Sequence, residues 1–98
     1  MGRNKFVGWY ELPTEYRAEL GDYLELYELR GLGRWSVDGR NGYEPDAFAV
    51  LRTYATLTYD YVMPRLAGLM GKGIRVAVFP IGMKTLDIVF YKREGEKP

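Results

Sequence analysis

Aromatic side chains are the residues of this chain best suited to binding chemistry. Nine tyrosines, four phenylalanines and two tryptophans occur among its 98 residues. Several of these rings lie one or two positions from a cation: Lys5-Phe6, Arg34-Trp35 and the run Phe90-Tyr91-Lys92-Arg93. Rings bordered by guanidinium and ammonium groups are what a platform for unstacked nucleobases requires. The same composition is typical of a well-filled small core, so the rings alone leave both interpretations open.

Catalytic chemistry has few candidate residues in this sequence. The chain contains no histidine and no cysteine, which removes the usual general base and the usual soft nucleophile or metal ligand. Ser36 is the only serine and has no histidine to activate it. The carboxylates between residues 15 and 28 are spread around a predicted helix and fit a solvated face. We therefore expect no enzymatic activity, no cofactor and no metal site.

Length and composition indicate a single domain over residues 1–98, with residues 94–98 as a flexible tail. No segment approaches the roughly 20 apolar residues of a membrane span. The first residues lead into a strand-like segment rather than a secretory apolar stretch. Without cysteine there is no disulfide framework, so the cytoplasm is the expected location.

The balance of heat-labile and charged residues bears on the source of the protein. Glutamine is absent, asparagine occurs only at Asn4 and Asn41, and charged residues make up 28% of the chain. Depletion of heat-labile side chains with retained charge is a hyperthermophile tendency. The composition therefore favours a thermophilic source.

Charge is unevenly distributed along the chain, although the net charge is only +1. Residues 11–60 hold ten acidic and five basic side chains, whereas residues 61–98 hold seven basic and three acidic ones. Arg3 and Lys5 make the N-terminal end basic as well. We therefore expect any phosphate-facing surface to come from the two ends of the chain.

The first half of the sequence predicts a strand, a helix and a second short strand. Residues 5–12 are aromatic and β-branched and end at Pro13, which indicates a strand. Residues 14–30 have helical apolar spacing, with Thr14 as N-cap and Gly31 beyond the end. Residues 23–29 also alternate in a way that fits a strand. Residues 34–38 indicate a short strand, followed by two turn-forming Asp-Gly and Asn-Gly pairs.

The second half predicts a long helix followed by a hairpin. The helix is expected to open at Glu44-Pro45-Asp46, to bend near Pro64 and to end at Gly71 and Gly73. Residues 74–79 and 85–93 are expected to pair around a loop containing Pro80 and Gly82. The predicted fold class is α+β, in the order β-α-β-α-β-β, with an antiparallel sheet of three to four strands against two helices.

Alternation along these strands predicts two different sheet faces. One face forms the core and consists of Phe6, Tyr10, Leu12, Ile74, Val76, Val78, Leu86, Ile88 and Phe90. The other, which we call the second face, mixes rings and cations and consists of Lys5, Val7, Trp9, Arg75, Ala77, Phe79, Asp87, Val89, Tyr91 and Arg93. If open to solvent, the second face would be unusual for a monomer.

The second face supplies the candidate binding residues. We expect Trp9, Phe79 and Tyr91 to stack on bases, at roughly 1–3 kcal/mol for each base. The groups expected to meet phosphates are those of Lys5, Arg75 and Arg93, while Trp35, beside Arg34, would extend the cleft. The alternative is that the long helix or a second subunit covers this face, because tyrosine is also enriched at ordinary protein interfaces.

Three segments carry a resemblance to a known family: Lys5-Phe-Val-Gly-Trp-Tyr, Gly33-Arg-Trp35, and Arg75-Val-Ala-Val-Phe with Phe90-Tyr-Lys-Arg93. In these the chain resembles the ThermoDBP group of thermophilic archaeal single-stranded nucleic-acid-binding proteins and their shorter relatives. The resemblance implies an antiparallel sheet with helices and an apolar cleft flanked by basic residues, in which bases lie. Longer members dimerise through a C-terminal coiled coil. This chain ends at Pro98 without heptads, which puts that mode of assembly in doubt.

These observations predict a non-catalytic protein that binds single-stranded DNA or RNA with little sequence preference. The competing hypothesis is a protein-interaction or homo-oligomerisation domain that buries the same aromatic surface, with a homodimer formed through the long helix or the sheet. A transcriptional regulator with a helix in the major groove is disfavoured, because the first predicted helix is acidic and the long one carries few basic residues.

Overall fold

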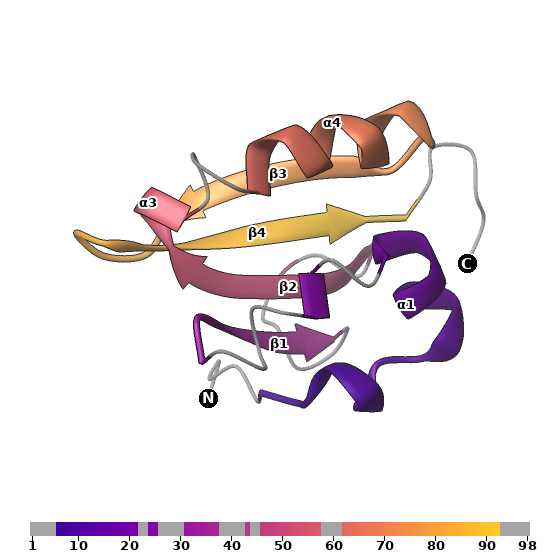
Figure 1. The fold of residues 1–98 in the computed structure, drawn as a ribbon, viewed down its shortest axis with the longest axis horizontal. Helices are drawn as coiled ribbons and strands as arrows, with labels where there is room; N and C mark the ends of the chain where they lie inside the picture. Colours follow the sequence, from indigo (N-terminus) through magenta and orange to yellow (C-terminus); the bar gives the residue numbers. More distant parts are fainter. Residues whose placement is uncertain are drawn as a thin grey trace.

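The computed structural model describes residues 6–21, 24–25, 31–37, 43, 46–57 and 62–92. In chain order the elements are the 3₁₀ helix η1 (Trp9–Glu11), helix α1 (Thr14–Leu20), strands β1 (Gly33–Val37) and β2 (Ala47–Tyr54), the helical turn α3 (Ala55–Leu57), helix α4 (Met63–Gly71), and strands β3 (Arg75–Pro80) and β4 (Thr85–Tyr91). The four strands form one antiparallel sheet, with α1 and α4 as the two main helices (Figure 1). The predicted α+β class is therefore confirmed.

The sheet has the strand order β1-β2-β4-β3, so β1 and β3 are its two edges (Figure 1). Each neighbouring pair is antiparallel, and Leu51 of β2 lies opposite Trp35 on one side and Ile88 on the other. Val78 of β3 in turn lies opposite Ile88. The connection from β2 to β3 runs through α4 and leaves space in the sheet for β4 between them.

The short strand and the C-terminal hairpin agree with the sequence-based predictions. Strand β1 lies within one residue of the predicted 34–38, and β3 pairs with β4 around the predicted loop. Within the hairpin, Leu86, Ile88 and Phe90 belong to the main core, whereas Val89 and Tyr91 belong to a cluster on the opposite face. The predicted alternation is therefore confirmed for β4, whereas Val78 of β3, expected in the core, is 38% exposed.

The long helix predicted from residue 44 is wrong, because residues 47–54 form strand β2. This strand is central in the sheet and is buried on both faces from Ala47 to Leu51. A strand buried on both faces is a continuous apolar run, whose spacing cannot be distinguished from that of a buried helix. Helix α4 begins at Met63, so Pro64 lies in its first turn, where its missing N–H costs nothing.

The strand predicted for residues 5–12 is also wrong. Val7 makes a single bridge to β1, with its N–H 2.7 Å from the carbonyl oxygen of Trp35. The chain then turns into η1, where the Gly8 N–H donates to the Glu11 carboxylate at 3.4 Å. This turn carries Trp9 into the core, while Phe6 and Tyr10, expected there, are exposed. The face assignments of these three rings are therefore corrected.

Helix α1 ends at Leu20 instead of continuing to residue 30. Gly21 has a φ of 83°, a backbone conformation that only glycine adopts readily, and its N–H still bonds to the carbonyl oxygen of Arg17 at 2.9 Å. Of residues 23–29 the structure describes only Leu24 and Glu25, so the choice between helix and strand there lies outside the described residues. The predicted turns after Val37 lie outside them as well.

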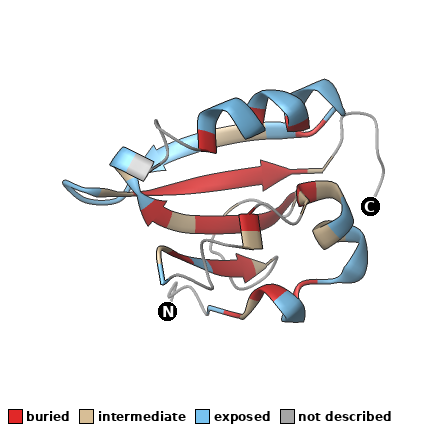
Figure 2. Ribbon diagram, in the orientation of Figure 1, coloured by how far each residue is buried: buried red, intermediate tan, exposed pale blue. Residues whose placement is uncertain are grey.

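The main core lies between one sheet face and the helices. It combines residues of η1, α1 and α4 with one face of the strands, including Trp9, Leu20, Leu66, Leu51 and Ile88. Figure 2 shows buried residues along β2 and β4 and exposed ones along β3 and the outer side of α4. Since the helices take one sheet face, functional side chains are left to the second face and the edges.

Candidate functional site

One row of polar and aromatic side chains crosses the whole second face of the sheet. The strand register aligns Arg34 of β1 with Arg52 of β2, Arg52 with Asp87 of β4, and Asp87 with Phe79 of β3. Neighbouring strands are about 4.8 Å apart, so this row is roughly 14 Å long. Segments far apart in the sequence thus bring two guanidinium groups and a ring onto one line.

Asp87 holds the middle of this row through a buried ion pair. Its carboxylate is fully buried and accepts two hydrogen bonds from Arg52, from Nε at 2.7 Å and from the second terminal nitrogen at 2.9 Å. The Tyr43 hydroxyl donates a third, at 2.8 Å. A buried carboxylate is tolerated only with such partners. The positive charge of Arg52 is therefore largely matched within the protein.

The same three groups shift one another's protonation equilibria. Burial of the Tyr43 phenol, together with its hydrogen bond to Asp87, raises its pKa to about 12. The hydrogen bond to Asp87 also raises the pKa of Arg52, against the opposing effect of desolvation. Tyr43 further stacks on Phe79, with ring centroids 5.4 Å apart, so it covers part of the second face.

A pocket lies at the β1 side of the row. It has a volume of about 350 Å³ and is lined by Phe6, Gly31, Leu32, Gly33, Arg34, Arg52, Thr53, Tyr54 and Thr85. The guanidinium carbons of Arg34 and Arg52 lie 5.5 Å and 5.7 Å from the centre of the Phe6 ring. Phe6 is 39% exposed and Tyr54 is 48% exposed. We call Phe6, Arg34, Arg52 and Tyr54 the β1-side cluster.

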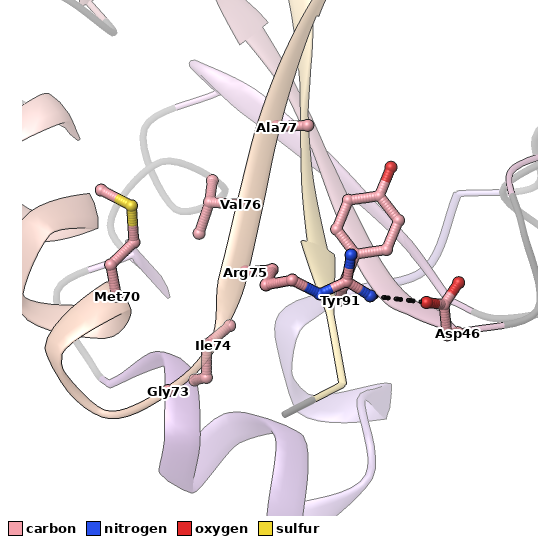
Figure 3. A pocket seen from close by; sticks show the side chains of 8 residues that line it. All are labelled: Asp46, Met70, Gly73, Ile74, Arg75, Val76, Ala77 and Tyr91. Atoms are coloured by element: carbon pink, nitrogen blue, oxygen red, sulfur yellow. Dashed lines mark hydrogen bonds and ion pairs between the residues drawn. The ribbon is translucent and has the colours of Figure 1, made fainter. Parts of the chain in front are cut away.

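A second group of rings and cations lies at the β3 side. The Arg75 guanidinium carbon is 5.0 Å from the centre of the Tyr91 ring, and a terminal nitrogen of Arg75 is 2.8 Å from the Asp46 carboxylate. These residues line an open groove of about 680 Å³ that also includes Met70 of α4 (Figure 3). Tyr91 itself is buried, whereas Arg75 and Phe79 are exposed.

The structure places the residues predicted from sequence in three environments. Arg75, Phe79 and Tyr91 lie on the second face, as expected, but Tyr91 is buried there rather than open for stacking. Arg34, which the sequence placed only beside Trp35 at the expected cleft, lies on the second face as well. Trp9 and Trp35 are only 1% and 0% exposed and pack against each other in the core, with ring centroids 5.3 Å apart. Their indoles are therefore core side chains and report on folding. Lys5 and Arg93 lie outside the described residues.

Sequence reasoning missed most of the β1-side cluster. Arg52 and Tyr54 were assigned to the long helix, and Phe6 was assigned to the core. A signal was present, since Val50, Arg52 and Tyr54 are spaced two residues apart, as are side chains on one face of a strand. It was obscured because Ala47 to Leu51 is apolar throughout, as is typical of a central strand.

Comparisons with known proteins add no relative. No protein-family model matches the chain, and neither a curated protein nor a solved structure matches it. Among the described residues, no helix has both the length and the apolar character needed to cross a membrane.

Proposed function

We propose that this protein binds single-stranded DNA or RNA without catalysis and with little sequence preference. The observation that carries the proposal is the β1-side cluster, in which two guanidinium groups and two exposed rings, Phe6 and Tyr54, line one pocket. Rings stack on any base, and guanidinium groups bind phosphate oxygens or stack on bases themselves. The resemblance to the ThermoDBP group points to the same class of ligand.

Arg34 supplies the positive charge of this pocket. Arg52 is paired with Asp87 and Arg75 with Asp46, whereas within the described part of the chain Arg34 has no carboxylate within ion-pair distance. Arg34 is exposed and its guanidinium lies against the Phe6 ring. A phosphate next to Phe6 would therefore meet a guanidinium that no acidic side chain of the described residues neutralises.

The sheet offers further contacts beyond the pocket. Phe79 and Arg75 lie at the other end of the second face, beyond the Tyr43 ring. Four-stranded sheets with exposed rings stack about two or three bases in single-stranded RNA-binding modules. We assign the Phe6 and Tyr54 end to base stacking. We assign the Arg75 end to a backbone contact of the same strand, in which a phosphate replaces the exposed Asp46 carboxylate as the partner of Arg75.

The test is the fluorescence anisotropy of a labelled oligothymidine titrated with the protein at low salt. Phe6→Ala should weaken binding by about 1–3 kcal/mol because it removes a stacking ring. Arg34→Ala should weaken it as well. Arg65→Ala is the matched control, since Arg65 is an exposed cation on α4, against the opposite face of the sheet. Tryptophan emission would verify that each variant is folded.

Two outcomes would argue against nucleic-acid binding. The first is an absence of binding by the unmodified protein at low salt. The second is an equal loss of affinity in Arg34→Ala and Arg65→Ala, which would indicate only a general charge effect. A duplex competitor that displaces the oligonucleotide as well as a single strand does would contradict the proposed preference for unpaired bases.

The competing proposal is that the exposed rings bind another protein chain. The observation that favours it is the apolar character of the β3 side, where Val78, Phe79 and Ile81 are all exposed. It predicts a complex that forms without nucleic acid and does not respond to it. Sedimentation with and without oligonucleotide separates the two proposals.

A further inference from the structure

Strand β3 is an edge of the sheet with unusual exposure. All of its residues are exposed or half-buried, whereas β4 beside it is almost completely buried. Val78 and Phe79, on opposite faces of the strand, are 38% and 39% exposed. An apolar edge strand with unpaired backbone groups is a template for pairing with another strand.

The hairpin register shows which backbone groups of β3 point away from the sheet. The Ile81 N–H bonds to the Thr85 carbonyl oxygen at 3.0 Å, so residues 81, 79, 77 and 75 direct their backbone groups towards β4. By alternation, Val76, Val78 and Pro80 direct theirs outward. Pro80 has no N–H, so Val76 and Val78 present the outward donors of this strand.

The groove of about 680 Å³ at this edge is lined by residues on both faces of β3. In Figure 3, Met70 and Val76 lie on one side of the β3 ribbon, and Arg75, Tyr91 and Asp46 on the other. An added strand places alternate side chains on opposite faces of a sheet. One face of β3 therefore offers apolar contacts and the other offers charged and aromatic contacts. The alternate side chains of an added strand could use both.

Strand β3 is complementary to a second copy of itself. An antiparallel pair centred on Ala77 places Val76 opposite Val78 of the second copy, with the outward donors and acceptors of both residues facing each other. On the second face the same register places Arg75 opposite Phe79 of the second copy. The pair is not hydrogen-bonded, so the two side chains lie close enough for a cation–π contact.

The ends of β3 fit this register too. Pro80 would lie opposite Ile74 of the second copy, and the Ile74 N–H is already bonded to the Leu69 carbonyl oxygen at 3.2 Å. Neither Pro80 nor Ile74 therefore has an unpaired backbone N–H at the end of the proposed strand pair. Asp46, bound to Arg75, offsets the charge that two symmetry-related arginines would bring to the interface.

We propose that two copies of this chain pair antiparallel through β3 about a two-fold axis at Ala77. The two four-stranded sheets then form one continuous sheet, and the second faces of both copies lie side by side. This assembly does not depend on nucleic-acid binding, and it is tested without an oligonucleotide.

Ala77→Cys tests the register directly, because the chain has no cysteine of its own. In the proposed dimer the two introduced thiols are symmetry mates in a non-hydrogen-bonded pair, with Cα atoms about 4.5 Å apart, within the range of a disulfide. Mild oxidation should therefore convert Ala77→Cys to a covalent dimer. Met83→Cys is the control, since Met83 is 99% exposed in the hairpin loop. Equal cross-linking of both variants, or none at position 77, would overturn the proposal.

Val78→Pro tests the same interface in the opposite direction. The substitution removes an outward N–H of β3 without removing a hydrogen bond to β4. The unmodified chain should sediment as a dimer, and Val78→Pro should sediment as a folded monomer. Val78→Thr keeps the donor and the branched side chain and should stay dimeric. A monomeric unmodified chain, or a Val78→Pro dimer with native tryptophan emission, would refute pairing through β3.

Discussion

Asp87 is the residue whose burial explains most of the chemistry on the second face. A carboxylate without solvent exposure needs compensating donors, and Arg52 and Tyr43 provide three. Removing one partner of a buried ion pair costs more than the pair contributes, because the remaining charge stays desolvated. The network therefore fixes the orientation of Arg52, which in turn supports the Phe6 ring.

Stability at alkaline pH should depend on Tyr43. The folded-state pKa of about 12 lies above the ordinary value of 10.0, so the folded protein holds this proton more tightly than the unfolded chain. The contribution to the free energy of unfolding is complete below pH 10 and decreases as the pH rises towards 12. Tyr43→Phe should lose less stability over this interval than the unmodified protein.

Urea unfolding at about pH 9 and about pH 11.5 measures this difference. Tyr54→Phe is the control, because it removes an exposed phenol on the same face and leaves the Asp87 network intact. It should keep the alkaline loss of the unmodified protein. Identical pH dependence in Tyr43→Phe and the unmodified protein would show that Tyr43 does not cause the alkaline loss of stability.

At the scale of elements, two glycines have opposite roles. Gly21 ends α1 with a φ of 83°, whereas Gly68 lies inside α4 on its exposed side. A Cβ atom at either position would meet nothing within 4 Å, so space does not distinguish them. The backbone conformation alone should decide the effect of a substitution.

Gly21→Ala should therefore lower the free energy of unfolding by about 1–3 kcal/mol, the cost of a positive-φ, extended conformation that L-residues rarely adopt. Gly68→Ala should raise it by about 0.5–1 kcal/mol, because alanine loses less backbone entropy in a helix. Chemical denaturation of both variants tests this prediction. A change of the same sign in both would show that α1 does not end at Gly21 as described.

At the scale of the whole molecule, a net charge of +1 limits nucleic-acid binding to local contacts. If Arg34 and Arg75 each neutralise one phosphate, log K should fall with log salt concentration at a slope of about −1.4. Arg34→Ala should reduce the magnitude of this slope by about 0.7, while Arg65→Ala should leave it unchanged. Oligonucleotide titrations at several salt concentrations measure it. A slope near zero in the unmodified protein would exclude phosphate contacts.

The sequence was sufficient to predict the α+β class, strand β1, and the hairpin of β3 and β4 with its alternating faces. These features depend on local signals, namely turn residues, β-branched runs and a two-residue period. It also placed Arg75 and Phe79 on the second face, because alternation along a strand does not depend on what the strand packs against.

The identity of β2 and the location of the tryptophans depended on packing between distant segments. Residues 47–54 are a strand because β1 and β4 pair with both of its edges, and an apolar run carries no period that would reveal this. Trp9 enters the core because a 3₁₀ turn, stabilised by Trp35 and the helices, interrupts the alternation that would have placed it outside. Local sequence specifies the side chains of the second face, but long-range contacts select which of them reach solvent.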